Sequence, residues 1–225
     1  MEVGVIFPQT EIEPDPSAIK DFAQAAEEMG YAYIFIADHV LGADPAHHDF
    51  PALRTYNHKS VVHETLTLMG YLSAITERVG LVTGILILPQ RQTALVAKQA
   101  AEIDVLSGGR LRLGIGVGWN TVEYEALGED FHNRGARSAE QIEVLRKLWA
   151  EPVIDYTGDH HRIERAGLKP LPGRQIPIWL GGFSEVAYRR AARLADGFIF
   201  GGGSRDGLAA LGQIRGYLDE AGRDG

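Results

Sequence analysis

The stretch Val79–Glu123 reads VGLVTGILILPQRQTALVAKQAAEIDVLSGGRLRLGIGVGWNTVE and decides the fold of this chain. An apolar run is followed by apolar residues at helical spacing, a Gly108-Gly109 turn and a second apolar run. A strand-helix-strand unit of this kind makes parallel strands, and ligands bind at the carboxyl ends of such strands. We therefore expect functional residues at Thr83-Gly84-Ile85 and at Gly116–Asn120.

Composition limits what the chain can be. With 225 residues, 45% of them hydrophobic, and no linker-like or low-complexity run, a single domain over residues 1–225 is predicted. A net charge of −8 argues against a nucleic-acid partner, and the lack of cysteine excludes disulfides, thiolate metal sites and cysteine nucleophiles. The apolar runs have strand length, below the roughly 20 residues of a membrane helix, so we expect no membrane partner and a cytoplasmic protein.

The same strand-helix alternation repeats along the whole sequence. Six strands are predicted, at Val3–Phe7, Tyr31–Ala37, Val79–Leu88, Leu111–Val117, Ile176–Leu180 and Gly197–Phe200. A helix is expected over 137–149 and a hairpin over 153–163. Strict alternation favours an α/β fold of the TIM (β/α) barrel type. Because a closed barrel of this type has about eight strands, six of eight units would leave an edge and an apolar inner face open, as in a C-terminally truncated barrel.

A series of motifs runs in order along the chain: Ala37-Asp38-His39, Thr83-Gly84-Ile85, Asp104–Arg110, Gly116–Asn120, Arg134–Arg137, Ile178–Gly182 and Ala195–Phe198. On these residues the chain resembles the luciferase-like monooxygenase superfamily, specifically its branch that uses the deazaflavin coenzyme F-420. The resemblance implies an eight-stranded barrel, of which this chain carries the first six units. It also implies a redox enzyme that binds coenzyme F-420, with FMN as the alternative cofactor, and that forms a homodimer.

Gly84-Ile85 lies inside a predicted strand, where a glycine usually marks a bulge or a close approach of the backbone. The resemblance implies a bulge with a non-prolyl cis peptide here, pressed against one face of the cofactor ring, with Thr83 beside it. A plain bulge in a tapering barrel interior is the alternative interpretation.

Asp38-His39 ends the second predicted strand, at the rim where barrel enzymes place catalytic groups. An imidazole can donate a hydrogen bond or supply a proton, and the resemblance implies a histidine beside the ring. His39 and Asp38 are therefore the candidate catalytic residues. Asp38 would fix the tautomer of the imidazole or cap the following loop, and His39 could instead make only a structural hydrogen bond.

Gly118, Trp119 and Asn120 end the fourth predicted strand. The string GIGVGW is not a dinucleotide fingerprint, because its third glycine falls one position early. Small residues would let a flat ring approach the backbone, while Trp119 lines the pocket and Asn120 hydrogen-bonds to the cofactor. Trp119 could equally be a core aromatic whose N–H finds a partner.

Two glycine-rich turns, Gly181–Ser184 and Gly201–Ser204, each connect a predicted strand to a helix. Free N–H groups at a helix start, with glycines that admit close approach, suit an anion such as the cofactor phosphate. The candidates are Gly181, Gly182, Ser184, Gly201 and Gly202, although glycines also serve ordinary strand-helix turns. For the acidic tail of the coenzyme, the candidate cations are Arg91, Arg134 and Arg137.

Histidine pairs at 47–48 and 160–161 are the sequence feature that most suggests a metal. Adjacent histidines rarely bind one ion, and no carboxylate stands at ligand spacing, so no metal site is predicted. The predicted function is hydride transfer between coenzyme F-420 and an unknown small organic substrate. An FMN-dependent monooxygenase and a non-catalytic, flavin-binding barrel remnant are the alternatives.

Overall fold

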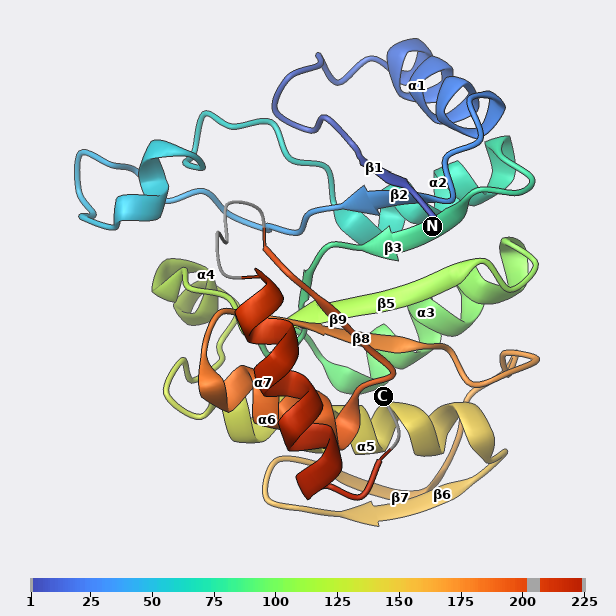
Figure 1. Ribbon diagram of the computed structural model, residues 1–225, viewed down its shortest axis with the longest axis vertical. Coiled ribbons are helices and arrows are strands. Elements are labelled where there is room, and N and C mark those ends of the chain that lie inside the picture. Colours follow the sequence, from blue (N-terminus) through green and yellow to red (C-terminus); the bar gives the residue numbers. More distant parts are fainter. Residues whose placement is uncertain (1, 202–206, 224–225) are drawn as a thin grey trace.

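The computed structural model describes residues 2–201 and 207–223, and it contains the predicted parallel sheet (Figure 1). The strands are Gly4–Ile6 (β1), Tyr33–Ile36 (β2), Gly80–Thr83 (β3), Leu86–Ile87 (β4), Leu111–Gly116 (β5), Ile178–Gly181 (β8) and Gly197–Ile199 (β9). They pair in the order β1-β2-β3-β5-β8-β9, all parallel, and β4 pairs with β5. The predicted barrel-type α/β architecture is confirmed as a curled, partial barrel.

Helices connect these strands and pack against the sheet. They span Pro16–Glu28 (α1), Thr65–Ile75 (α2), Thr93–Leu106 (α3), Thr121–Ala126 (α4), Arg134–Ala150 (α5), Glu185–Leu194 (α6) and Gly207–Glu220 (α7), with short 3-10 turns at Pro51–Arg54 (η1) and Leu88–Gln90 (η2). Helices α2, α3 and α6 contact β3, β5 and β8 respectively. The residues between these layers form one buried apolar core.

The prediction of one continuous strand over Val79–Leu88 is wrong. The segment divides into β3 and β4, and the interruption is the predicted bulge, with a cis peptide bond between Gly84 and Ile85. Leu88 already belongs to η2. Both segments pair with β5: Val82 lies opposite Arg112 and Leu86 opposite Ile115, so the break inserts one extra residue relative to β5 near the carboxyl edge of the sheet.

The predicted hairpin is confirmed, and it lies outside the sheet. Its strands are Ile154–Thr157 (β6) and Arg162–Ala166 (β7), which pair antiparallel beside α5. The imidazole of His161 holds the hairpin to the helices. Its Nδ1 lies 2.7 Å from Oε1 of Glu140 in α5, and its Nε2 lies 2.6 Å from Oγ1 of Thr93 in α3.

Large and small residues alternate on the inner face of the curled sheet. A Cβ on Gly80 would lie 2.6 Å from the Tyr33 ring, and a Cβ on Gly197 would lie 2.7 Å from the Trp179 ring. Among the described residues, β1 and β9 each pair on one side only, so both edges are open as expected. Ile6, in edge strand β1, is 73% exposed.

Candidate functional site

His39 follows β2 at the carboxyl edge of the sheet, and aromatic side chains surround it. Its ring stacks on Tyr56, from the loop before α2, with 3.8 Å between centroids and 13° between planes. Trp119, which follows β5, meets the same imidazole edge-on at 5.6 Å. The structure therefore brings together two of the predicted site residues, His39 and Trp119. Tyr56 is an addition that the sequence did not indicate.

Glu123 is the main site residue that sequence reasoning missed. Its side chain is 0% exposed, and its Oε2 lies 3.0 Å from Nδ1 of His39. Oε1 accepts hydrogen bonds from the backbone N–H of Val40 at 2.6 Å and of Leu41 at 3.0 Å. The sequence signal was the spacing Asn120-x-x-Glu123, which is typical of a helix start.

Asn120, like Glu123, links α4 to the segment that follows β2. Its Oδ1 caps α4 by accepting from the N–H of Val122 at 3.2 Å, and its Nδ2 donates to the carbonyl of Leu41 at 3.0 Å. Asn120 and Glu123 together fix α4 to the segment that follows β2. Asn120 is thus fully engaged inside the protein, which is a different use from the predicted contact to a cofactor.

Asp38 has other partners than His39. Its buried carboxylate accepts from the N–H of Ile87 at 2.9 Å and from the hydroxyl of Thr65 at 3.1 Å, and it lies 2.7 Å from Nη2 of Arg91. Glu64 binds the same guanidinium at 3.0 Å. Burial lowers the pKa of Arg91, but the charges and hydrogen bonds of Asp38 and Glu64 outweigh burial, so this pKa is raised. Asp38 therefore anchors β4, and Arg91 is already engaged.

Isoleucines of the bulge fill the space above the glycines at the strand ends. A Cβ on Gly116 would lie 2.7 Å from Ile85, and a Cβ on Gly181 would lie 2.8 Å from it. Gly118, whose φ is +64°, would place a Cβ 2.7 Å from Ile87. These glycines are thus required by packing around the bulge.

Thr83 lies directly before the bulge and is fully buried. Its hydroxyl donates to the carbonyl of Gly114 at 2.5 Å, which ties β3 to β5 just below the displaced segment.

The first glycine-rich turn contains the N-cap of α6. Ser184 Oγ accepts from the N–H of Ala187 at 3.3 Å, and a Cβ on Gly182 would lie 2.6 Å from the Ala187 side chain. Gly201 lies against the Phe183 ring, where a Cβ would clash. The predicted Gly202 lies outside the described residues.

Two arginines near the start of α5 lack an acidic partner. The guanidinium of Arg134 lies 3.7 Å above the Phe131 ring, and Arg190 of α6 lies against Gly135. Within residues 2–201 and 207–223, neither has a carboxylate within 4.0 Å, whereas Arg137 pairs with Glu129 at 2.5 Å. Burial lowers the pKa of Arg190, and the adjacent charge of Arg134 lowers it further. This local excess of positive charge suits an anion.

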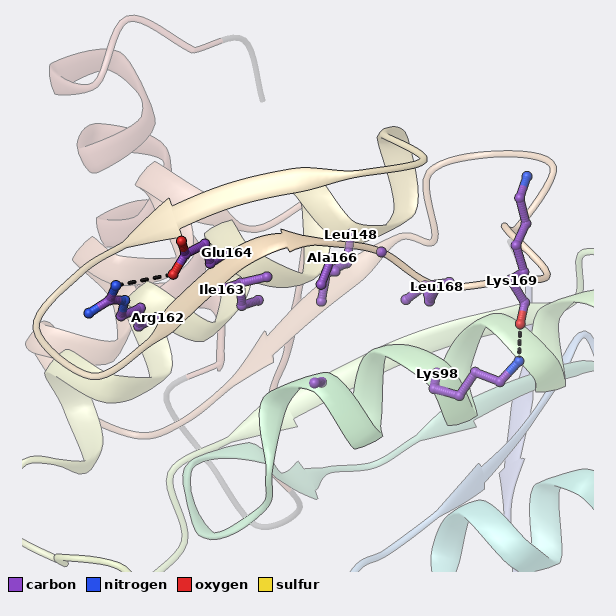
Figure 2. A pocket seen from close by; sticks show the side chains of 10 residues that line it. Lys98, Leu148, Arg162, Ile163, Glu164, Ala166, Leu168 and Lys169 are labelled. Atoms are coloured by element: carbon purple, nitrogen blue, oxygen red, sulfur yellow. Dashed lines mark hydrogen bonds and ion pairs between the residues drawn. The ribbon is translucent and has the colours of Figure 1, made fainter.

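A cavity of about 600 Å³ lies away from the strand ends (Figure 2). It opens between the hairpin and the outer helices, with Lys98, Leu148 and Ile163 in its lining, and Lys98 donates to the carbonyl of Lys169 at its border. None of the predicted site residues lines it. In the described ranges no cluster of three potential metal ligands was found, and no helix there is long and apolar enough to cross a membrane.

A family model described as luciferase-like monooxygenase matches residues 1–225. The chain belongs to the luciferase-like monooxygenase family. A Mycobacterium tuberculosis protein of uncharacterized function is 35% identical over 206 residues, 89% of this chain and 71% of that protein. An F420-dependent glucose-6-phosphate dehydrogenase of Nakamurella multipartita is 31% identical, covering 92% of this chain and 60% of the enzyme. An FMNH(2)-dependent dimethylsulfone monooxygenase of Pseudomonas fluorescens is 36% identical, covering 66% and 41%.

Solved structures with the same fold include proteins of both cofactor types. An F420-dependent secondary alcohol dehydrogenase in complex with an F420-acetone adduct matches with a TM-score of 0.81 at 21% identity, over 100% of this chain and 66% of that chain. A riboflavin lyase with modified FMN and riboflavin matches with a TM-score of 0.81 at 21% identity, over 99% and 59%. The chain spans 41–66% of the length of the named enzymes. The predicted family is confirmed, and the named relatives include an F420-dependent dehydrogenase and an FMNH(2)-dependent monooxygenase.

Proposed function

We propose that this chain binds coenzyme F-420 at the carboxyl edge of its sheet and supports hydride transfer between that cofactor and a small organic substrate. One observation carries the proposal. The side chains of His39 and Trp119 meet where β2 and β5 end, in a chain that belongs to this family. In the described part of the chain, Nε2 of His39 has no hydrogen-bond partner. The cofactor, when bound, supplies the redox chemistry.

The residues at this edge fit a flat, polar ring with a charged tail. Nε2 of His39 is placed to accept or donate one hydrogen bond to the ring or to the substrate, and to hold or release a proton there. Ile85 gives an apolar surface between the strand ends. The half-buried indole of Trp119 covers the side toward β5 and excludes water.

The charged tail of the cofactor would bind between the starts of α5 and α6. Among the described residues, Arg134 and Arg190 have no carboxylate within 4.0 Å, and the buried Nε of Arg134 has no hydrogen-bond partner there. Gly182 and Ser184 form the turn before α6, the helix that carries Arg190, and the N–H groups at its start favour an anion. Of the candidate cations from the sequence, Arg134 is thus retained, whereas Arg91 and Arg137 are paired with carboxylates.

FMN is the second candidate cofactor, because FMN-dependent proteins stand beside F420-dependent ones among the similar proteins. Fluorescence titration with oxidised coenzyme F-420 and, separately, with FMN tests the choice. We expect saturable binding of the deazaflavin that weakens in Arg134→Gln but not in Arg162→Gln, which removes an exposed charge of the hairpin. Tight FMN binding with none of the deazaflavin would overturn the choice of cofactor.

Turnover decides between an enzyme and a non-catalytic, flavin-binding remnant. Oxidation of the reduced deazaflavin with a panel of small carbonyl substrates should be lost in His39→Asn and kept in His132→Asn, which removes an exposed imidazole. Cofactor binding without turnover, both in this chain and in the product of its whole gene, would favour the remnant. The single domain, the homodimer and the cytoplasmic location stay predictions, for limited proteolysis, light scattering and cell fractionation to test.

A further inference from the structure

We infer that Glu123 is a positioning residue, which keeps the proton of neutral His39 on Nδ1 and so leaves Nε2 as the atom that meets a ligand. Hydrogen-bonding groups surround the carboxylate of Glu123. Its two oxygens face the N–H groups of Val40 and Leu41 and the imidazole of His39, at 2.6 to 3.0 Å. The statement about a ligand rests on the proposed function, whereas the statement about the proton does not.

Glu123 has no lysine or arginine partner in the described part of the chain, since none lies within 4.0 Å of its carboxylate. Its side chain is 0% exposed. An ionised carboxylate can only accept hydrogen bonds, so each of its neighbours has to donate. The phenol of Tyr56 responds to the same charge: burial raises its pKa, and Glu123 and Asp38 raise that pKa further.

For His39 the consequence is a fixed tautomer. A neutral imidazole carries one N–H, and the atom that faces an obligatory acceptor has to be the one that carries it. Nδ1 faces Oε2 of Glu123, so Nε2 keeps its lone pair. The stack on Tyr56 and the edge contact with Trp119 restrain rotation of the ring, so the two nitrogens keep these places.

Helix capping alone does not account for Glu123. It is the third residue of α4, where a glutamate commonly reaches back to the N–H of its own N-cap residue. Its carboxylate instead reaches residues 39–41, which lie 82 to 84 positions earlier in the sequence. Capping of α4 does not require a contact to residues 39–41, because Asn120 already caps this helix.

Side-chain 15N NMR of the chain without any cofactor tests the inference directly. At a pH where His39 is neutral, its resonances, assigned by their loss in His39→Asn, should show the Nδ1-protonated pattern. In Glu123→Gln the amide oxygen can still accept from Val40 and Leu41, but the NH₂ group then faces Nδ1. The proton should therefore move to Nε2, while Glu125→Gln, which changes an exposed carboxylate of the same helix, keeps the wild-type pattern.

An Nε2-protonated pattern in the wild-type chain, or an unchanged pattern in a folded Glu123→Gln variant, would overturn the inference. If that variant does not fold, the wild-type spectrum decides alone. A titration with coenzyme F-420 then separates the two proposals. Loss of a matched hydrogen bond at Nε2 should weaken binding to Glu123→Gln by about tenfold. The expected tautomer in a protein that binds neither cofactor would refute the proposed function and leave this inference standing.

Discussion

Asp38 and His39 are neighbours in sequence, yet their side chains have separate partners. Asp38 turns toward β4 and Arg91, whereas His39 turns toward Glu123 and Trp119. Successive side chains of an extended chain point in opposite directions, so adjacent residues at a strand end naturally serve different layers. At this position one residue supports the bulge and the other faces the site.

Asp38→Ala should destabilise the protein, because it leaves the buried N–H of Ile87 without its acceptor and leaves Arg91 with Glu64 alone of its two carboxylates. A buried donor left without an acceptor costs about 1–3 kcal/mol. Urea denaturation followed by circular dichroism measures the loss. Asp49→Ala changes an exposed loop residue whose side chain makes no hydrogen bond within the described ranges, and it should stay within about 0.5 kcal/mol of wild type. Equal effects of the two variants would contradict the role assigned to Asp38.

Gly118→Ala should destabilise the chain by about 1–3 kcal/mol, since it combines a positive φ with a contact to Ile87. Two other glycines separate these causes. Gly128→Ala has a φ of +74° but open space, and should show only the conformational part. Gly70→Ala, inside α2 with open space, should stabilise by about 0.5–1 kcal/mol. Thermal unfolding of all three variants ranks them, and the reverse order would refute the packing argument.

At the level of elements, regular periodicity was enough to predict most of the fold. The alternation of strands and helices, the helix over 137–149 and the hairpin follow from spacing and turn residues. The short elements at the carboxyl edge of the sheet could not be predicted from spacing. The break between β3 and β4 depends on how Ile85 packs over the ends of neighbouring strands, and α4 has too few residues to show a period.

The hairpin offers a test at this scale, through Glu140. Burial raises the pKa of Glu140, but hydrogen bonds from His161 and from the N–H groups of His160 and Asp159 outweigh it, so this pKa lies below its ordinary value of 4.5. A lowered pKa contributes stability above pH 4.5, and that contribution is lost as the pH falls through the folded-state value.

Glu140→Gln should therefore be less stable than wild type at pH 7, and the difference should shrink as the pH falls below 4.5. Hydrogen exchange of residues 154–166, followed by mass spectrometry at pH 7 and again below pH 4.5, measures the difference in stability between the two proteins. Glu164→Gln, an exposed change within β7, is the matched control. A difference that stays constant with pH would show that this carboxylate does not act through its charge.

The whole molecule is an open, curled sheet with an uneven distribution of apolar surface. The motifs could place the chain in its family and predict this opening, because they run in order through six β/α units. They could not predict the His39–Glu123 contact, since its partners lie 84 positions apart and the contact forms only when β2 and β5 are brought to one edge.

Exposed apolar side chains at the open edge should bind a hydrophobic dye. Ile6, on edge strand β1, is 73% exposed, and Met29, after α1, is 76% exposed. We expect Ile6→Lys to reduce the fluorescence of bound anilinonaphthalene sulfonate, whereas Met29→Lys, at a side chain of similar exposure away from the sheet edge, leaves it unchanged. Equal reductions would mean that the dye does not distinguish the open edge from the rest of the surface.

Ile85 also constrains the order in which the site can change during evolution or design. One side chain occupies the space above two glycines on separate strands, Gly116 and Gly181, so a methyl group added at either position meets it. Shortening Ile85 first would make room, and an alanine at either glycine could then be accepted. The opposite order passes through a crowded, unstable intermediate. New ligand preferences at this edge are therefore reached more readily by routes that begin at the isoleucine.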